Sequence, residues 1–138
     1  MIDVENDVFS IVANALRTDF PDIFVYGEYV EKPAGFPCVT LVEADNRVLT
    51  SMRTIKIENA ASVMYDVNIF SNKGSGKKEE AKSIARIVDG LMETMGFTRT
   101  FREQIPNLKD ATIYRIVCRY EAIVAPGYND TYLIYQNT

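Results

Sequence analysis

Histidine is absent from the 138 residues of this sequence. That absence removes the usual general base and a common zinc ligand, and it excludes every Ser-His or Cys-His nucleophile pair. The G-x-S-x-G pattern of a hydrolase nucleophile is missing too. Asp66 and Glu121 remain as a carboxylate pair for acid–base chemistry, but no second motif supports them. We therefore expect no catalytic residues and a protein that is not an enzyme.

Cysteine is scarce, and long apolar runs are lacking. Cys38 and Cys118 each lie in a strand-like apolar stretch without C-x-x-C spacing, which predicts buried free thiols. Every apolar run is broken by charge before the ~18–20 residues that a membrane span needs. The opening "MIDVENDVFS" has acids where a secretory signal has basic residues. The sequence thus predicts a cytosolic origin, with no cofactor and no metal.

Positive charge is in deficit and unevenly distributed. The net charge of −4 argues against a dedicated nucleic-acid binder. Residues 1–31 hold seven acids and one arginine, a net of −6, so the rest of the chain carries +2. The cations of the segment 73–86 are Lys73, Lys77, Lys78, Lys82 and Arg86. Such asymmetry has two explanations. Either these charges are solvated surface side chains without a role, or they form a pair of complementary faces on a self-assembling subunit.

Hydrophobic periodicity predicts two helices. Apolar residues from Val4 to Leu16 recur at helical spacing behind Asp3, a candidate N-cap. A second apolar stripe runs from Ala81 to Met95. Gly96 follows it at the position where a left-handed C-cap belongs.

Besides the two predicted helices, the sequence contains several strand-like stretches. The tail is a candidate for a further short edge strand. The main stretches are 23–30, 38–45, 62–70, 97–106 and 112–124. Within the last of these, alternation turns Arg115, Arg119 and Glu121 away from the core. The order predicts one α+β domain, residues 1–138: a single-layer, mainly antiparallel sheet with two helices packed on one face. The weakly patterned segment 46–60 is predicted to be a flexible arm or hairpin.

The stretch "SNKGSGKKEEAKSIARI" has the outline of a phosphate loop, because a strand precedes it and a helix follows. A P-loop requires G-x-x-x-x-G-K-[ST]. Ser71 stands where its first glycine belongs, and Lys78 stands where the magnesium-binding hydroxyl belongs. Two of the four fixed positions therefore fail. The remaining interpretation is a flexible connection with solvated lysines, in which Ser75 or Asn72 caps the helix.

Three longer pieces of sequence carry a family resemblance. They are "VYGEYVEKPAGFPCVTLVE", "YDVNIFSNKGSGKKEEAKSIARIVDGLMETMGF" and "YRIVCRYEAIV". Together with the acidic N-terminal helix, their order and spacing resemble the tail terminator, or tail completion, proteins of long-tailed bacteriophages and prophages. The resemblance covers most of the chain and contains no catalytic signature.

The resemblance implies a small α+β subunit of a homo-oligomeric ring, a hexamer in this family. Such a ring caps the tail tube, ends tail elongation and provides the head-joining surface. The implied partners are other copies of the chain, the tail-tube protein and a head–tail connector protein. The implied location is the tail or neck of the virion, after assembly in the bacterial host cytoplasm.

On this interpretation, function lies in surfaces that meet neighbours or line the lumen. The candidate interface residues are Arg47, Arg53, Lys56, Lys73, Lys77, Lys78, Arg115, Arg119 and Glu121. For each of them, a solvated surface side chain is the simpler explanation. Two other functions remain open: a head–tail connector or other minor capsid component, and a small-ligand or nucleotide-binding enzyme.

Overall fold

The computed structural model describes residues 1–49, 60–107, 109–126 and 132–136, with backbone alone for 126 and 132–136. In chain order the elements are α1 (Glu5–Asp19), β1 (Phe24–Tyr26), β2 (Cys38–Val48), β3 (Ala61–Ser71), α2 (Lys77–Thr94), β4 (Thr98–Gln104), β5 (Tyr114–Pro126) and β6 (Tyr132–Gln136). This order confirms the predicted α+β fold, and β6 is the short strand expected in the tail.

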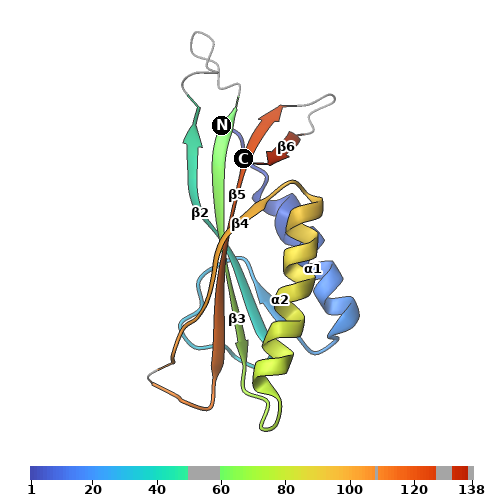
Figure 1. Ribbon diagram of the computed structural model, residues 1–138. Helices are drawn as coiled ribbons and strands as arrows, with labels where there is room; N and C mark the ends of the chain where they lie inside the picture. Colours follow the sequence, from blue (N-terminus) through green and yellow to red (C-terminus); the bar gives the residue numbers. More distant parts are fainter. Residues whose placement is uncertain (50–59, 108, 127–131, 137–138) are drawn as a thin grey trace.

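The six strands form one sheet in the order β1-β2-β3-β5-β4, with β6 also paired to β5. β3 pairs antiparallel with β5 along its whole length, from Ala61↔Val124 to Ser71↔Tyr114. On the other edge of β5, β4 pairs with Ile116–Glu121 and β6 pairs with Ala122–Pro126. The two short strands therefore share one edge of β5, while β2, β3 and β5 extend beyond the helices (Figure 1).

Both helices cover the same face of the sheet, here called the helix face (Figure 1). Strand periodicity explains the core, because every second residue of β3 and β5 points to this face. Tyr65 and Tyr120 are its largest fully buried side chains, and Phe97 packs edge-on against Tyr65 at 5.5 Å between ring centroids. α2 contacts β3, β5 and β4, and α1 packs beside α2. The opposite side of the sheet is called the outer face below.

The helix ends follow the sequence in part. α1 has Val4 as its N-cap instead of Asp3, whose carboxylate accepts the Glu5 N–H at 3.0 Å. α2 ends as predicted, with Gly96 at φ 101° and the Phe97 N–H bonded to the Met92 carbonyl at 2.9 Å. This hydrogen bond and a second one from Gly96 to Glu93 define a Schellman motif.

β1 departs most from expectation. The stretch 23–30 forms only the three-residue strand Phe24–Tyr26, and it runs parallel to β2, so the sheet is mixed. Parallel neighbours cannot be joined by a tight turn. The connection 27–37 therefore crosses the outer face before β2 begins (Figure 1). Gly35 packs so closely on Phe24 that an added Cβ would lie 2.3 Å from its ring.

The two cysteines are buried and free, as predicted. Cys118 lies on the helix face, beside Tyr120. Cys38 pairs in register with Phe70 on the outer face, where Thr40 and Asn68 are also buried. Burial raises the pKa of the Cys38 thiol to about 11, which keeps it protonated at neutral pH. In the part of the chain that the structure describes, no helix is long and apolar enough to cross a membrane.

Candidate assembly surfaces

The loop between β3 and α2 does not have the contacts of a phosphate site. Lys77 Nζ donates to the Ala111 carbonyl oxygen at 3.1 Å, so this lysine ties α2 to the β4–β5 turn. Gly76 is the N-cap of α2 at φ 95°, and no side chain caps the helix, so the expectation of Ser75 or Asn72 was wrong. The buried Ser71 hydroxyl donates to Glu80 Oε1 at 2.7 Å. The position of the first P-loop glycine is thus occupied by a residue that anchors the helix.

Arg119 is held on the outer face by two neighbouring strands. Its Nε and Nη2 donate to the two carboxylate oxygens of Asp66 at 2.7 and 3.1 Å. Its guanidinium lies 5.1 Å from the ring centroid of Phe101 on β4. The hydrogen bonds to Asp66 raise the pKa of Arg119 above its ordinary value, so it stays charged at every accessible pH. The side chain is fixed before any partner arrives.

Arg115, four residues earlier on β5, is held by contacts with β3 alone. Its Nε and Nη2 donate to Asn68 Oδ1 at 3.0 and 2.7 Å, and its guanidinium lies 5.4 Å from the Phe70 ring centroid. Asn68 is neutral, so this contact orients the guanidinium without cancelling its charge. The arginines on β5 therefore form a rigid ladder with one compensated and one uncompensated charge.

Asp66 and Glu121, the carboxylate pair considered for acid–base chemistry, are diagonal neighbours on the outer face and do not stand directly opposite each other. Asp66 stands opposite Arg119 in the β3–β5 register, and Glu121 stands opposite Met64. Arg47, the candidate on β2, forms an exposed ion pair with Asp45 at 2.9 Å. Among the described residues, no group of three histidine, cysteine or acidic side chains is placed to hold a metal ion.

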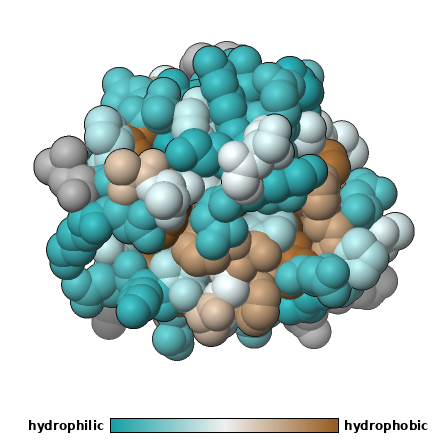
Figure 2. All heavy atoms as spheres, turned by 90° about the horizontal axis from the view of Figure 1, so that it is seen from below, coloured by the Kyte–Doolittle hydropathy of each residue, from teal (hydrophilic) through white to brown (hydrophobic). Residues whose placement is uncertain are grey.

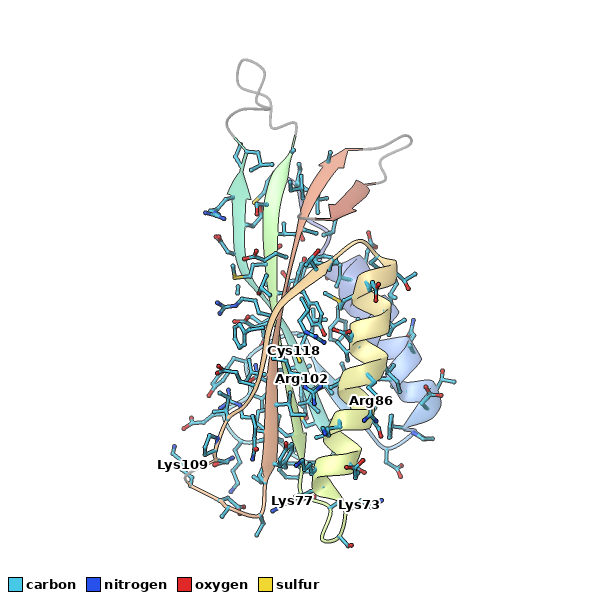
Figure 3. All side chains as sticks on the ribbon, in the orientation of Figure 1. Lys73, Lys77, Arg86, Arg102, Lys109 and Cys118 are labelled. Atoms are coloured by element: carbon cyan, nitrogen blue, oxygen red, sulfur yellow. The ribbon has the colours of Figure 1, made fainter. Side chains whose placement is uncertain are left out.

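The predicted interface residues thus fall into separate groups. Arg115, Arg119, Glu121 and Arg47 lie on the outer face, by the alternation and register of β2, β3 and β5. Lys73, Lys77 and Lys78 lie at the start of α2, at the opposite end of the sheet from the β2–β3 hairpin (Figure 3). Arg53 and Lys56 lie outside the described residues. Of the segment 46–60, Asn46–Val48 belong to β2 and pair with Ala61–Val63.

A groove of about 530 Å³ separates the β1–β2 connection from the β4–β5 turn. Pro33, Phe36 and Ile113 provide its apolar lining, and an exposed ion pair of 3.2 Å joins Glu31 to Lys109 across it. Figure 2 shows the molecule from this end, with hydrophobic side chains near the centre of a mostly hydrophilic surface. Nothing in the lining sequence predicted this groove, because the two segments are 70 residues or more apart.

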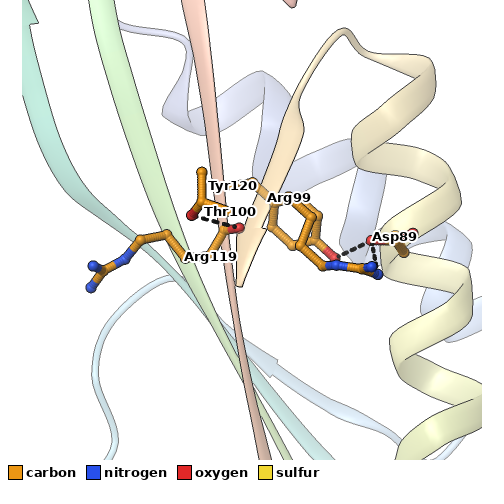
Figure 4. Close-up of polar contacts among 5 residues, drawn as sticks. All are labelled: Asp89, Arg99, Thr100, Arg119 and Tyr120. Atoms are coloured by element: carbon orange, nitrogen blue, oxygen red, sulfur yellow. Dashed lines mark hydrogen bonds and ion pairs between the residues drawn. The ribbon is translucent and has the colours of Figure 1, made fainter. Parts of the chain in front are cut away.

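One flank of the molecule is formed by α2 and β4 and is called the α2/β4 flank. Arg99 Nη1 donates to Asp89 Oδ1 at 3.0 Å, and the buried Tyr120 hydroxyl donates to the same oxygen at 3.0 Å (Figure 4). Asp89 therefore shows which side of α2 faces β4. Arg86, one turn earlier on that side, and Arg102, on β4, are both exposed (Figure 3). Neither has a hydrogen bond or ion pair to the described part of the chain.

The opposite flank, formed by α1 and β1, is acidic and is called the α1/β1 flank. A hollow of about 420 Å³ lies between the first turns of α1 and the residues that follow β1. Glu5 and Glu28 bring carboxylates to this hollow, and Phe9 and Tyr26 bring aromatic rings. The strand order places this flank at the other edge of the sheet from β4. The acidic excess of residues 1–31 thus lies on one flank of the molecule.

A polar cluster near the α1/β1 flank holds the N-terminal segment. Asn46 Nδ2 donates to the Ile2 carbonyl oxygen at 2.8 Å and to Glu43 Oε1 at 3.3 Å. The buried Tyr65 hydroxyl donates to the same Glu43 oxygen at 3.3 Å. Burial raises the pKa of Glu43, and the hydrogen bonds from Asn46 and Tyr65 oppose that rise. The cluster joins β2, β3 and the N-terminus, which makes it a structural feature.

Sequence reasoning missed Glu5, Glu28 and Arg102 as surface candidates. Glu5 and Glu28 were counted within the acidic segment 1–31, but their convergence depends on the packing of α1 beside β1. Arg102 lay in a strand whose bulge between Arg99 and Phe101 shifts the alternation. The chain matches no protein-family model, and no curated protein is significantly similar to it.

Proposed function

We propose that this chain is a structural subunit of a ring that caps the tail tube of a long-tailed bacteriophage. The ring ends tail elongation and provides the surface to which the head is joined. The proposal starts from the sequence resemblance to tail terminator proteins. The observation that carries it further is the fold: an α+β subunit in the implied element order, with β2, β3 and β5 extending beyond the helices (Figure 1).

The extension is suited to contact with a tube. β3 pairs with β2 on one side and with β5 on the other, so the projecting part is a sheet and not a single hairpin. Arg47 lies on the outer face of this extension. Its strand, β2, is separated from β5 by β3. A rigid sheet loses little conformational entropy when it docks. The helices and sheet flanks remain available for neighbouring subunits in the ring.

The proposed partners are further copies of the chain, the tail-tube protein and the head–tail connector protein. Assembly takes place in the bacterial host cytoplasm, and the finished ring lies in the tail or neck of the virion. The arginine ladder on the outer face is suited to such contacts because Arg115 and Arg119 are already ordered. Ordered guanidinium groups recognise carboxylates with good geometry.

The test is a tube-capping assay. The tail-tube protein from the same genome is polymerised alone and together with the purified chain, and tube lengths are measured by electron microscopy. We expect short tubes that carry a ring at one end. Tubes of unchanged length without terminal density would refute the proposal. Binding to the head side of the neck and not to tubes would indicate a head–tail connector instead.

A further inference from the structure

We infer that neighbouring copies of this chain meet flank to flank, with Arg102 of one copy entering the acidic hollow on the α1/β1 flank of the next. The inference rests on the proposed function, because it specifies the lateral contact of the proposed ring. The two flanks are different surfaces at opposite edges of one sheet. A contact between different surfaces is heterologous, and such contacts close into rings when the rotation between neighbours is suitable.

The hollow has the chemistry that a guanidinium group requires. Glu5 and Glu28 supply carboxylates, and Phe9 and Tyr26 supply ring faces within one concave site of about 420 Å³. Arginine pairs with carboxylates and stacks on aromatic rings, whereas lysine stacks on aromatic rings less well. The chain already uses this combination internally, where Arg119 pairs with Asp66 and lies over Phe101.

The donor side offers arginines that have no hydrogen bond or ion pair among the described residues. Arg102 projects from the helix face of β4, since its register partner Cys118 points to that face, yet it is exposed. Arg99, three residues earlier, is already taken by Asp89. Arg86 lies about one turn before Asp89 on α2, so the flank carries a second exposed guanidinium group that has no hydrogen bond or ion pair to the described residues. The positive charges of these exposed guanidinium groups are stabilised when carboxylates approach them.

Charge complementarity selects a second copy as the occupant. The acidic excess of the chain lies in residues 1–31, which form the α1/β1 flank, whereas β4 on the other flank carries two arginines against one glutamate. Two copies placed side by side therefore bring opposite charges together at every contact around the ring. An assembly through identical flanks would instead bring like charges together.

The experiment uses charge reversal in both directions. Arg102→Glu reverses the donor, and Glu5→Arg with Glu28→Arg reverses the hollow. We expect each variant to weaken self-association by at least about tenfold in sedimentation velocity at low salt. A 1:1 mixture of the two variants should restore assembly, because each of its heterologous contacts then joins opposite charges. Lys109→Glu, the same change of charge at an exposed residue of the β4–β5 turn, outside both flanks, is the matched control and should associate like the natural chain.

The outcomes separate this inference from the proposed function. Unaltered association of both reversed variants would overturn the inference, as would a failure of the mixture to reassemble while each variant remains folded by circular dichroism. A natural chain that stays monomeric at about 100 µM, a concentration at which typical protein interfaces are occupied, would also overturn it. If the mixture reassembles but the natural chain caps no tubes, the proposed function fails and the flank contact stands. If Arg102→Glu caps tubes as well as the natural chain, only the flank contact fails.

Discussion

Tyr120 on β5 donates its hydroxyl hydrogen to Asp89 on α2 at 3.0 Å, and this bond fastens the second helix to the sheet (Figure 4). The same carboxylate oxygen accepts a hydrogen bond from Arg99 on β4. Asp89 therefore connects one helix to two strands. The ring of Tyr120 is buried beneath this contact, so its hydroxyl would have no alternative partner in water.

Tyr120→Phe should lower the free energy of unfolding by about 0.5–1.5 kcal/mol, because it removes this hydrogen bond and keeps the ring. Urea denaturation monitored by circular dichroism would measure the loss. Tyr114→Phe is the control, since Tyr114 has no side-chain hydrogen bond in the described part of the chain; its effect should stay within about 0.5 kcal/mol. Equal stability of the two variants would mean that the bond to Asp89 contributes nothing.

Gly96 and Gly90 should respond in opposite directions to alanine. Gly96 has φ 101° in the Schellman motif, so Gly96→Ala forces a left-handed alanine and should cost about 1–2 kcal/mol. Gly90 lies within α2, and an added Cβ there would meet no atom within 4 Å. Gly90→Ala should therefore gain about 0.5–1 kcal/mol from helix propensity. Thermal unfolding of both variants tests the pair, and a gain at Gly96 would contradict the cap assignment.

Glu43 should make stability depend on pH. Burial raises the pKa of its carboxyl above the ordinary value of 4.5, with further increases from Glu5 and Asp3. The folded state therefore binds this proton more tightly than the unfolded state, and stability falls as pH rises from the ordinary pKa through the raised one. Glu43→Gln removes this fall and keeps an oxygen acceptor for Tyr65 and Asn46.

We expect the Glu43→Gln variant to be at least as stable as the natural chain at pH 7, and to gain less on acidification toward pH 4. Urea midpoints at several pH values between these limits provide the measurement. Exposed Glu103→Gln serves as the control, and its pH profile should follow that of the natural chain. A Glu43→Gln variant that gains more stability on acidification than the natural chain would show that the carboxylate is stabilised in the folded state.

The two arginine contacts on the outer face should differ in their response to salt. Arg119 pairs with the charged Asp66, and their side chains are 37% and 26% exposed, so water screens part of the attraction. A double-mutant cycle with alanine should give a coupling of about 0.2–1 kcal/mol, which decreases at high salt. Arg115 and Asn68 form the matched cycle, whose coupling should hardly change because Asn68 is neutral. A salt-independent Arg119–Asp66 coupling would argue against an ion pair.

The core of the fold was accessible from sequence because it depends on local periodicity. The alternation within 112–124 assigned both faces of β5 correctly, and Gly96 marked the end of α2. The parallel pairing of β1 was not accessible. It depends on the path of 27–37 across the outer face, which is fixed by tertiary contacts such as Gly35 against Phe24.

The candidate surfaces show the same limit. Sequence placed Arg115 and Arg119 on the outer face, since strand alternation alone decides that. It did not provide their partners, because Asp66 and Asn68 are brought to them by the register between β3 and β5. The acidic hollow joins residues from α1 to others after β1, so no local pattern could reveal it. Charge composition signalled the asymmetry, and only the fold turned it into two flanks.

The loop from Asn72 to Gly76 also divides the chain into two locally connected halves. Before it, β2 and β3 form a hairpin; after it, β4, β5 and β6 follow one another as paired neighbours. The halves join along the β3–β5 ladder, and α2 packs over that seam. We therefore expect the loop to be a split point: two fragments ending and starting there should reassociate, because β3 and β5 pair along the seam from Ala61↔Val124 to Ser71↔Tyr114.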